Sequence, residues 1–449
     1  MPWELNNKGI PSVKLEVIRA LDERLPTLSD RDMNQILNEA KRIVRMKLGS
    51  HIDFHFHDNG IISLDELFKD KSYRNTARYR KLNRDRYDLE RGPDMPCLKE
   101  EKFKKRVIKF LKRWDLKDLT GFFPDQTIIN YDDVYNNLFR VYHQRVSHLK
   151  TLRTPNGNLL LKSPLPPYQS YVEWDSFLRY QDRYDIIFTN TLIMADLMSE
   201  PYPHSVLKHA KIGGGGFLCP KCTAFNGNTV MISTIEEHGN IKGLSDMDKN
   251  ISRELKNKVI GGFLLAHEIG HALYLLPDVY DHGDMCLMSS SLSNFDYVKG
   301  YNLLLSDPTA CSKCLQDVRT AESIIYGKLA YKDGAYNKAA DFYLEGAGKM
   351  PSKIGDYVNW YKWCIYQRAL ELYEKIGHQE NIEKTRRLIE SLEDLRKKKS
   401  KKRTTLLLKK HKMSGLETTP QYLFDPTHAS SSKQIYHGLA FLFLAPNIV

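Results

Sequence analysis

The sequence predicts an α+β protein in which a mixed sheet and a long apolar helix lie between two helical regions. Residues 184–194 and 227–234 are short runs of apolar and β-branched residues, which are typical of strands. Residues 258–276 form a longer apolar stretch that ends before Pro277, as expected for a buried helix. The domain boundaries that we expect are 1–120 for a charged, mainly helical N-terminal region, 121–320 for the mixed domain, 321–395 for a helical region and 396–449 for a basic flexible tail.

Within the N-terminal region, apolar residues between Val13 and Leu48 recur at helical spacing and predict two helices. Residues 51–67 alternate like a strand and then become helical. Residues 70–117 are dense in Arg, Lys and Tyr, which predicts solvated helices. The four consecutive glycines at 213–216 predict a loop.

The charge of the chain is concentrated in its tail. Of the formal net charge of +12, ten positive charges lie between Arg396 and Lys412, a segment without acidic residues. A basic tail on a nearly neutral body disfavours a nucleic-acid partner. No apolar stretch approaches the ~20 residues that a membrane span needs, and the first residues lack the pattern of a secretory signal. We therefore expect a cytoplasmic protein without a membrane partner.

The helical region carries a second pattern. Gly334, Tyr336, Ala339, Tyr343 and Pro351 have spacings similar to those of a tetratricopeptide hairpin. A solenoid needs at least three such units, so we expect a partial array that offers a surface to a protein partner. A plain helical bundle is the alternative.

The motif that carries chemistry lies within the long apolar helix. His267 and His271 are separated by one helical turn and project from the same face, so that both imidazoles can bind one zinc ion. Glu268 lies about 100° further round the helix, where a carboxylate can take a proton from a zinc-activated water. An ordinary pair of helix histidines is the alternative, but the apolar neighbours would then bury ionisable groups without compensation.

With the residues that follow, this motif resembles the metzincin clan of zinc peptidases, and within it the archaemetzincins. The residues that match in order are His267, Glu268, His271, His282, Cys286, Met288, Cys311 and Cys314. The resemblance covers about residues 180–320. It implies a metzincin-like catalytic domain, His282 as the third ligand of the catalytic zinc, and Met288 as the methionine of the turn beneath the site.

The match is incomplete after His271. The family has a glycine three residues later and its third histidine after three more, whereas this chain has Tyr274 and Pro277 at those positions. His282 comes eleven residues after His271. Other oxygen ligands therefore compete with it, and they are Asp278, Asp281, Asp284 and, on a later helix, Glu322.

The cysteines predict a second, structural zinc. The family has a cysteine directly after its third histidine, but this chain has Gly283 there. Two C-x-x-C pairs, Cys219 with Cys222 and Cys311 with Cys314, make up a four-cysteine tetrahedral site, with Cys286 as an alternative ligand. Unrelated free thiols or a redox pair are the competing interpretations.

These observations predict a zinc-dependent metallopeptidase that acts on a peptide or protein substrate with Glu268 as general base. We expect the strand at 227–234 to be the sheet edge that pairs with this substrate. The alternative from another class is a non-catalytic, zinc-stabilised scaffold that binds protein partners through its helical repeats. Nucleic-acid binding through the cysteine pairs and the tail is a further rival.

Overall fold

A computed structural model describes residues 12–84, 86, 101–112, 115–120, 123, 126–197, 210–217, 228–244, 251–279, 282, 285–289, 297–350 and 356–395. The chain divides into two compact units, residues 3–322 and 323–449. None of the helices in the described ranges has the length and apolar character required to cross a membrane.

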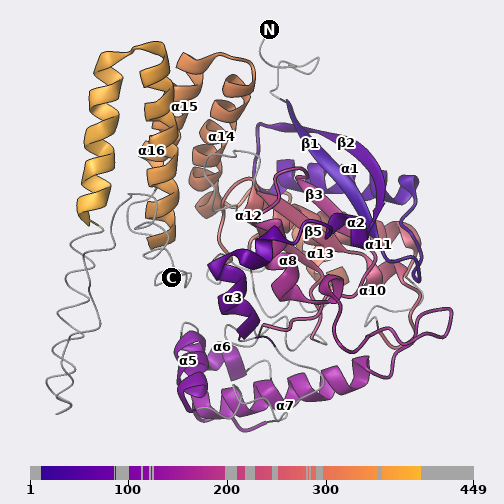
Figure 1. Ribbon diagram of the computed structural model, residues 1–449. Coiled ribbons are helices and arrows are strands. Elements are labelled where there is room, and N and C mark those ends of the chain that lie inside the picture. Colours follow the sequence, from indigo (N-terminus) through magenta and orange to yellow (C-terminus); the bar gives the residue numbers. More distant parts are fainter. Residues whose placement is uncertain are drawn as a thin grey trace, which may run out of the picture. The chain divides into compact units, whose positions relative to one another are not determined.

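The first unit contains a five-stranded mixed sheet (Figure 1). In spatial order its strands are β2 (Asp53–Ser63), β1 (Ser12–Leu21), β3 (Ile186–Thr189), β5 (Thr229–Ser233) and β4 (Gly214–Phe217). The first four run parallel, and β4 pairs antiparallel with β5. With the helices described below, this sheet confirms the α+β class. It also corrects two expectations, because β5 is an inner strand and the glycine run forms the edge strand β4 instead of a loop.

The first N-terminal helix that the sequence predicts is wrong, because residues 12–21 form strand β1. Val13, Leu15 and Val17 also fit the two-residue period of a strand, which the helical interpretation overlooked. Val17, Ile18 and Ala20 are all buried, as expected for a parallel strand covered on both faces. The second predicted helix is present as α1 (Asp30–Lys47), whose N-terminus is capped by the side chain of Ser29.

Side chains of β4 and β5 alternate between the two faces of the sheet. Met231 and Phe217 belong to a core cluster that includes Trp174 of α8 (Tyr171–Leu178). Gly214 and Ile232 face the helix that carries the two predicted zinc ligands, since a Cβ on Gly214 would lie 3.1 Å from both Ile232 Cδ1 and Glu268 Cγ. The sheet thus presents its β4 edge to this helix.

Helices complete the first unit, and a second core forms around α7. That core includes Phe103, Val107, Leu138 and Tyr142. Apart from the helix over 253–272, which carries the predicted zinc ligands, the remaining elements are α2 (Leu64–Leu67), η1 (Ser72–Asn75), α3 (Ala77–Arg84), α5 (Glu101–Leu111), α6 (Leu116–Thr120), α7 (Tyr131–Leu149), η3 (Pro167–Gln169), α10 (Ile235–His238), α13 (Tyr297–Ser306) and the beginning of α14 (Ser312–Lys332).

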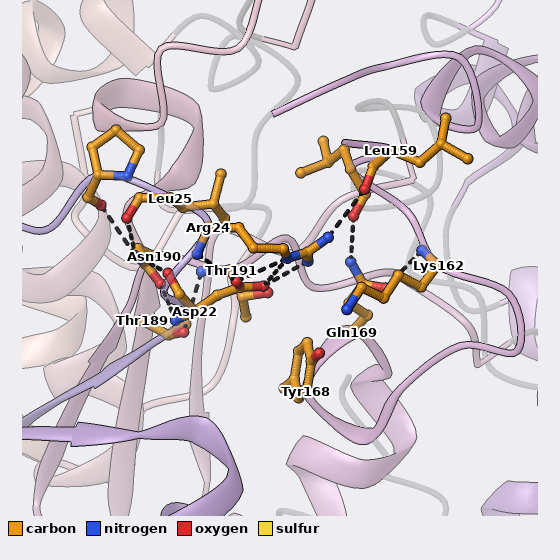
Figure 2. Close-up of polar contacts among 12 residues, drawn as sticks. Asp22, Arg24, Leu25, Leu159, Lys162, Tyr168, Gln169, Thr189, Asn190 and Thr191 are labelled. Carbon is orange, nitrogen blue, oxygen red and sulfur yellow. Dashed lines mark hydrogen bonds and ion pairs between the residues drawn. The ribbon is translucent and has the colours of Figure 1, made fainter. Parts of the chain in front are cut away.

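A polar network ties the loops after β1 and β3 (Figure 2). The Asn190 side chain accepts from the backbone N–H of Asp22 at 2.7 Å and donates to the carbonyls of Asp22 and Leu25. The Asp22 carboxylate accepts from the guanidinium of Arg24 at 2.6 Å. The carboxyl ends of parallel strands are frequent ligand sites, but here Asp22 and Asn190 are engaged in holding these two loops together.

The second unit is helical in its described part. It contains the end of α14, then α15 (Tyr336–Lys349), α16 (Asp356–Ile376) and a helix over residues 379–395. Gly334 adopts a positive φ of 73° in the turn before α15, and the buried Tyr343 packs against Gly327 of α14. The predicted helical region is therefore present, and its use as a partner surface stays a prediction. The basic tail lies outside the described residues.

Candidate metal centres

His267 and His271 lie on the last part of one continuous helix. Its parts are α11 (Arg253–Val259), the π-helix η4 (Ile260–Leu265) and α12 (Ala266–Ala272). The helix packs closely on α1, because a Cβ on Gly261 would clash with the carbonyl oxygen of Ile36. The apolar pattern thus predicted this helix, but its end at Ala272 comes before Pro277.

The two imidazoles are oriented by backbone carbonyls. Nδ1 of His267 lies 2.7 Å from the Leu287 carbonyl oxygen, and Nδ1 of His271 lies 2.7 Å from that of Leu276. Because a carbonyl oxygen only accepts, each Nδ1 carries a proton, and in the neutral rings each Nε2 presents a lone pair. These two Nε2 atoms are only 3.0 Å apart. Two Nε2 atoms at this distance either share one proton in a hydrogen bond or direct their lone pairs at one bound cation.

Asp278 completes a set of three ligand atoms. Its Oδ1 lies 3.3 Å from Nε2 of His267 and 3.4 Å from Nε2 of His271. A tetrahedral zinc with bonds of ~2.0–2.1 Å has ligand–ligand distances of about 3.3–3.4 Å, so the three atoms fit one ion. The side chains are 21%, 19% and 21% exposed for His267, His271 and Asp278. This partial exposure suits a catalytic site, in which water or substrate takes the fourth position.

A turn directly after α12 brings Asp278 to the histidines. Leu275 adopts a positive φ of 59°, and the Leu276 N–H donates to the Gly270 carbonyl at 3.1 Å. This is the left-handed conformation that normally favours glycine. The chain thus reverses one residue after Tyr274, the position at which the metzincin pattern has glycine, and Asp278 follows one residue after Pro277.

The structure does not bring the predicted third ligand, His282, to this pair; the aspartate that the sequence left as an alternative is there instead. The physical reason is that the turn at Leu275 returns the chain early. Glu322 is also elsewhere, since its buried carboxylate accepts from the His51 N–H and from Arg319, each at 2.6 Å. Asp281 and Asp284 lie outside the described residues.

The charges at the site are strongly coupled. Burial lowers the pKa of His271, but the Asp278 carboxylate outweighs this effect and raises the pKa to about 9. Burial raises the pKa of Glu268, while the neighbouring histidines and the Gly216 N–H act in the opposite direction. A buried carboxyl group with a raised pKa binds a proton more readily than an exposed one, which suits it to proton transfer.

The edge strand β4 lies directly against α12. A Cβ on Gly216 would lie 2.6 Å from Cβ of His271 and 2.8 Å from the carbonyl oxygen of Glu268. A Cβ on Gly214 would lie 3.2 Å from Oε1 of Glu268. Glycine therefore allows the strand to approach the helix closely, and this explains a glycine run that the sequence alone suggested to be a loop.

Met288 lies beneath the same helix. It is fully buried, and its sulfur occupies the space that a Cβ on Gly270 would need. Gly270 directly precedes His271, so Met288 supports the backbone of the ligand helix from below. This contact agrees with the expected place of Met288, and its role as the methionine of a metzincin turn stays a prediction.

The second cluster consists of His282, Cys286, Cys311 and Cys314. Nδ1 of His282 lies 3.2, 3.8 and 3.6 Å from the sulfurs of Cys314, Cys286 and Cys311, and the sulfurs of Cys286 and Cys314 are 3.7 Å apart. Zinc with bonds of ~2.0 Å to nitrogen and ~2.3 Å to sulfur gives spacings of about 3.5 and 3.8 Å. The four atoms therefore fit a closed tetrahedral site.

The structure brings together one part of the expected cysteine site, and it adds a histidine. Cys311, Cys314 and the alternative ligand Cys286 come together, and His282 supplies the fourth atom. Cys219 and Cys222 lie outside the described residues. Histidine and cysteine both bind zinc at such sites. The spacing of His282, four residues before Cys286, is therefore a sequence signal for this cluster, although the family resemblance points to the other centre.

The surroundings of this cluster favour one thiolate, that of Cys286. A hydrogen bond from Cys314 lowers the pKa of the Cys286 thiol to about 5, and the same pairing raises that of Cys314. Lys47, only 1% exposed, donates from Nζ to the Asp307 carbonyl at 2.8 Å. Its own carbonyl accepts from the Cys311 N–H at 3.2 Å. The end of α1 thus holds both a cationic side chain and a backbone contact near the cysteines.

Comparisons with protein-family models, with curated proteins and with solved structures find no match for this chain.

Proposed function

We propose that the protein is a zinc-dependent metallopeptidase of metzincin-like type. The observation that carries this proposal is the convergence of His267, His271 and Asp278 on one point, with buried Glu268 on the same helix. Met288 beneath the helix and an antiparallel edge strand beside it support the same assignment. The cluster of His282 with three cysteines fits a second, structural zinc.

A zinc ion held by the three residues would supply Lewis acidity that activates water and polarises the scissile carbonyl. Glu268 would take the proton from the water and deliver it to the leaving amine. The Gly216 N–H interacts with the Glu268 carboxylate and would help to orient it for both transfers. The Leu287 and Leu276 carbonyls fix the tautomers of the two histidines, so that each Nε2 is kept for the metal.

The edge of the sheet indicates how an extended substrate would bind. Among the described strands, β4 pairs with β5 alone, and it is packed against α12. An extended peptide added to the other side of β4 would gain main-chain hydrogen bonds and pass close to Glu268. We therefore assign substrate pairing to β4 in place of the inner strand at 227–234.

The substitution Glu268→Gln tests this function. It removes the general base while keeping side-chain volume, so hydrolysis of a fluorogenic peptide library should fall roughly 10²–10⁴-fold with zinc content unchanged. Glu254→Gln, on the exposed face of the same continuous helix, is the matched control and should retain activity. If the zinc-loaded wild type cleaves no peptide, or if the Glu268→Gln variant cleaves as fast as the wild type, the non-catalytic scaffold becomes the better interpretation.

A further inference from the structure

One short segment, residues 286–289, contributes to both candidate metal centres. Cys286 is a member of the cluster with His282. The next residue, Leu287, accepts from Nδ1 of His267 at 2.7 Å. Met288 lies beneath Gly270, and its carbonyl accepts from the N–H of Val279 at 2.9 Å. Cys286 thus belongs to the cluster with His282, while the next two residues contact the other centre. They contact its ligand His267, the ligand helix at Gly270, and the segment that carries Asp278.

This segment is a tight and buried turn. Cys286, Leu287, Met288 and Ser289 are at most 4% exposed, and the Ser289 N–H donates to the Cys286 carbonyl at 3.0 Å. A displacement of the Cys286 sulfur is therefore transmitted to the Leu287 carbonyl, because close-packed interiors transmit strain. Val279 forms a parallel bridge with Ser289, so the residue next to Asp278 is held by the same turn.

The other members of the cluster anchor the turn from outside. Cys314 lies in the first turn of α14, and the Cys311 N–H binds the carbonyl at the end of α1. A metal shared by Cys286, Cys311 and Cys314 would fasten the turn to these two helices. Without it, the thiols are held by weak hydrogen bonds to one another and to His282.

We propose that the metal in the cluster of His282, Cys286, Cys311 and Cys314 is a positioning element, which sets the metal affinity of the centre formed by His267, His271 and Asp278. This inference rests on the proposed function in so far as that centre is the catalytic one. Second-sphere contacts to metal ligands change affinity by about 10–100-fold. By linkage, binding at either centre strengthens binding at the other by the same factor.

Metal titration of the full chain tests the coupling without reference to activity. The metal-free protein is first given one equivalent of Cd²⁺, a soft ion that prefers thiolates, and its location is checked by the thiolate–metal ultraviolet absorption. Co²⁺ is then titrated, and its visible absorption reports occupancy of the nitrogen and oxygen ligands. We expect Co²⁺ to bind about 10–100-fold more tightly with Cd²⁺ present than without it. Equal Co²⁺ affinity in the two titrations overturns the proposal.

A variant gives the second measurement. Cys314→Ser should lower the Zn²⁺ affinity of the centre with His267 by about 10–100-fold. The matched control is Cys364→Ser, which changes a buried cysteine of α16 in the other unit and should leave that affinity unaltered. If Cys314→Ser does not fold, the Cd²⁺ titration of the wild type still decides. Because both readouts are affinities, a failure of peptidase activity leaves the coupling measurable, and a failure of the coupling leaves the peptidase proposal intact.

Discussion

The two candidate metal centres lie on neighbouring segments of the chain but differ in the way they are built. At the first, two nitrogens and one oxygen converge, and about a fifth of each side chain is exposed. At the second, three sulfurs and one nitrogen surround the centre, and Cys286 and Cys314 are 4% and 3% exposed. An incomplete, accessible ligand set suits catalysis, whereas a complete and buried set suits structural support.

The local chain geometry explains the difference. The first centre takes two ligands from one helical turn and one from the strand-like segment just after it, so its ligands are close in sequence. The second takes its ligands from a loop (His282), a turn (Cys286) and the start of α14 (Cys311 and Cys314). A metal bound there would therefore connect separate segments of the chain. Substitutions at the first centre should therefore affect chemistry. Substitutions at the second should affect stability and, through the coupling proposed above, the metal affinity of the first.

The largest effect is expected from His267→Ala. The substitution removes one of three ligands and breaks the contact to the Leu287 carbonyl, so bound zinc should fall from two equivalents to one and peptidase activity should fall by about 10³-fold or more. Elemental analysis with a peptide-cleavage assay measures both. His55→Ala, an exposed histidine of β2, is the control and should retain two zincs. Two bound zincs in the His267→Ala variant would show that His267 is not needed for metal binding and would contradict the centre of His267, His271 and Asp278.

Two substitutions of Asp278 test whether this residue is the third ligand. Asp278→Ala removes the oxygen ligand and should weaken zinc at the centre of His267, His271 and Asp278 by more than the ~10–100-fold that loss of a ligand-orienting contact costs. Asp278→His supplies the nitrogen that the metzincin pattern has at its third position and should restore much of the affinity. Competition with a chromophoric chelator measures the dissociation constants. Unchanged affinity in the alanine variant would reassign the third ligand.

At the cluster of His282, Cys286, Cys311 and Cys314 we expect substitutions to lower the stability of the fold. His282→Ala should release one zinc and lower the thermal midpoint, by about 2–4 °C for each kcal/mol lost. His282→Cys keeps a ligand atom at that position and should retain the zinc and most of the stability. Calorimetry with metal analysis separates the two variants. If alanine and cysteine behave alike, His282 is not a ligand.

The smallest effect is expected at the edge strand. In Gly216→Ala the new methyl group meets His271 and the Glu268 backbone, so β4 must move away from α12. We expect a several-fold loss of kcat/KM with zinc retained, since a shift of the strand misplaces both the substrate and the Gly216 N–H. Gly348→Ala is the control, because a Cβ there meets no atom within 4 Å and alanine favours the helix. Equal kcat/KM in both variants would argue against β4 as the binding edge.

The sequence determined the local part of this protein. The i, i+4 spacing of His267 and His271 on an apolar stretch is enough to place both imidazoles on one face, because helical periodicity does not depend on distant residues. The strands at 186–189 and 229–233 and the C-terminal helices follow from similarly local patterns. The N-terminal strand at 12–21 was misassigned because, over so short a run, both periods fit its apolar residues.

Only the tertiary structure decided which ligands belong to which centre. His282 and Asp278 are both candidates for the third ligand in the sequence. Asp278 reaches the histidines because of a left-handed turn at Leu275, where the sequence has no glycine to indicate such a turn. The place of the glycine strand depended on how closely β4 approaches α12. The assignment of ligands and the position of β4 depend on contacts between residues that are far apart in the sequence. Local sequence patterns do not encode such contacts.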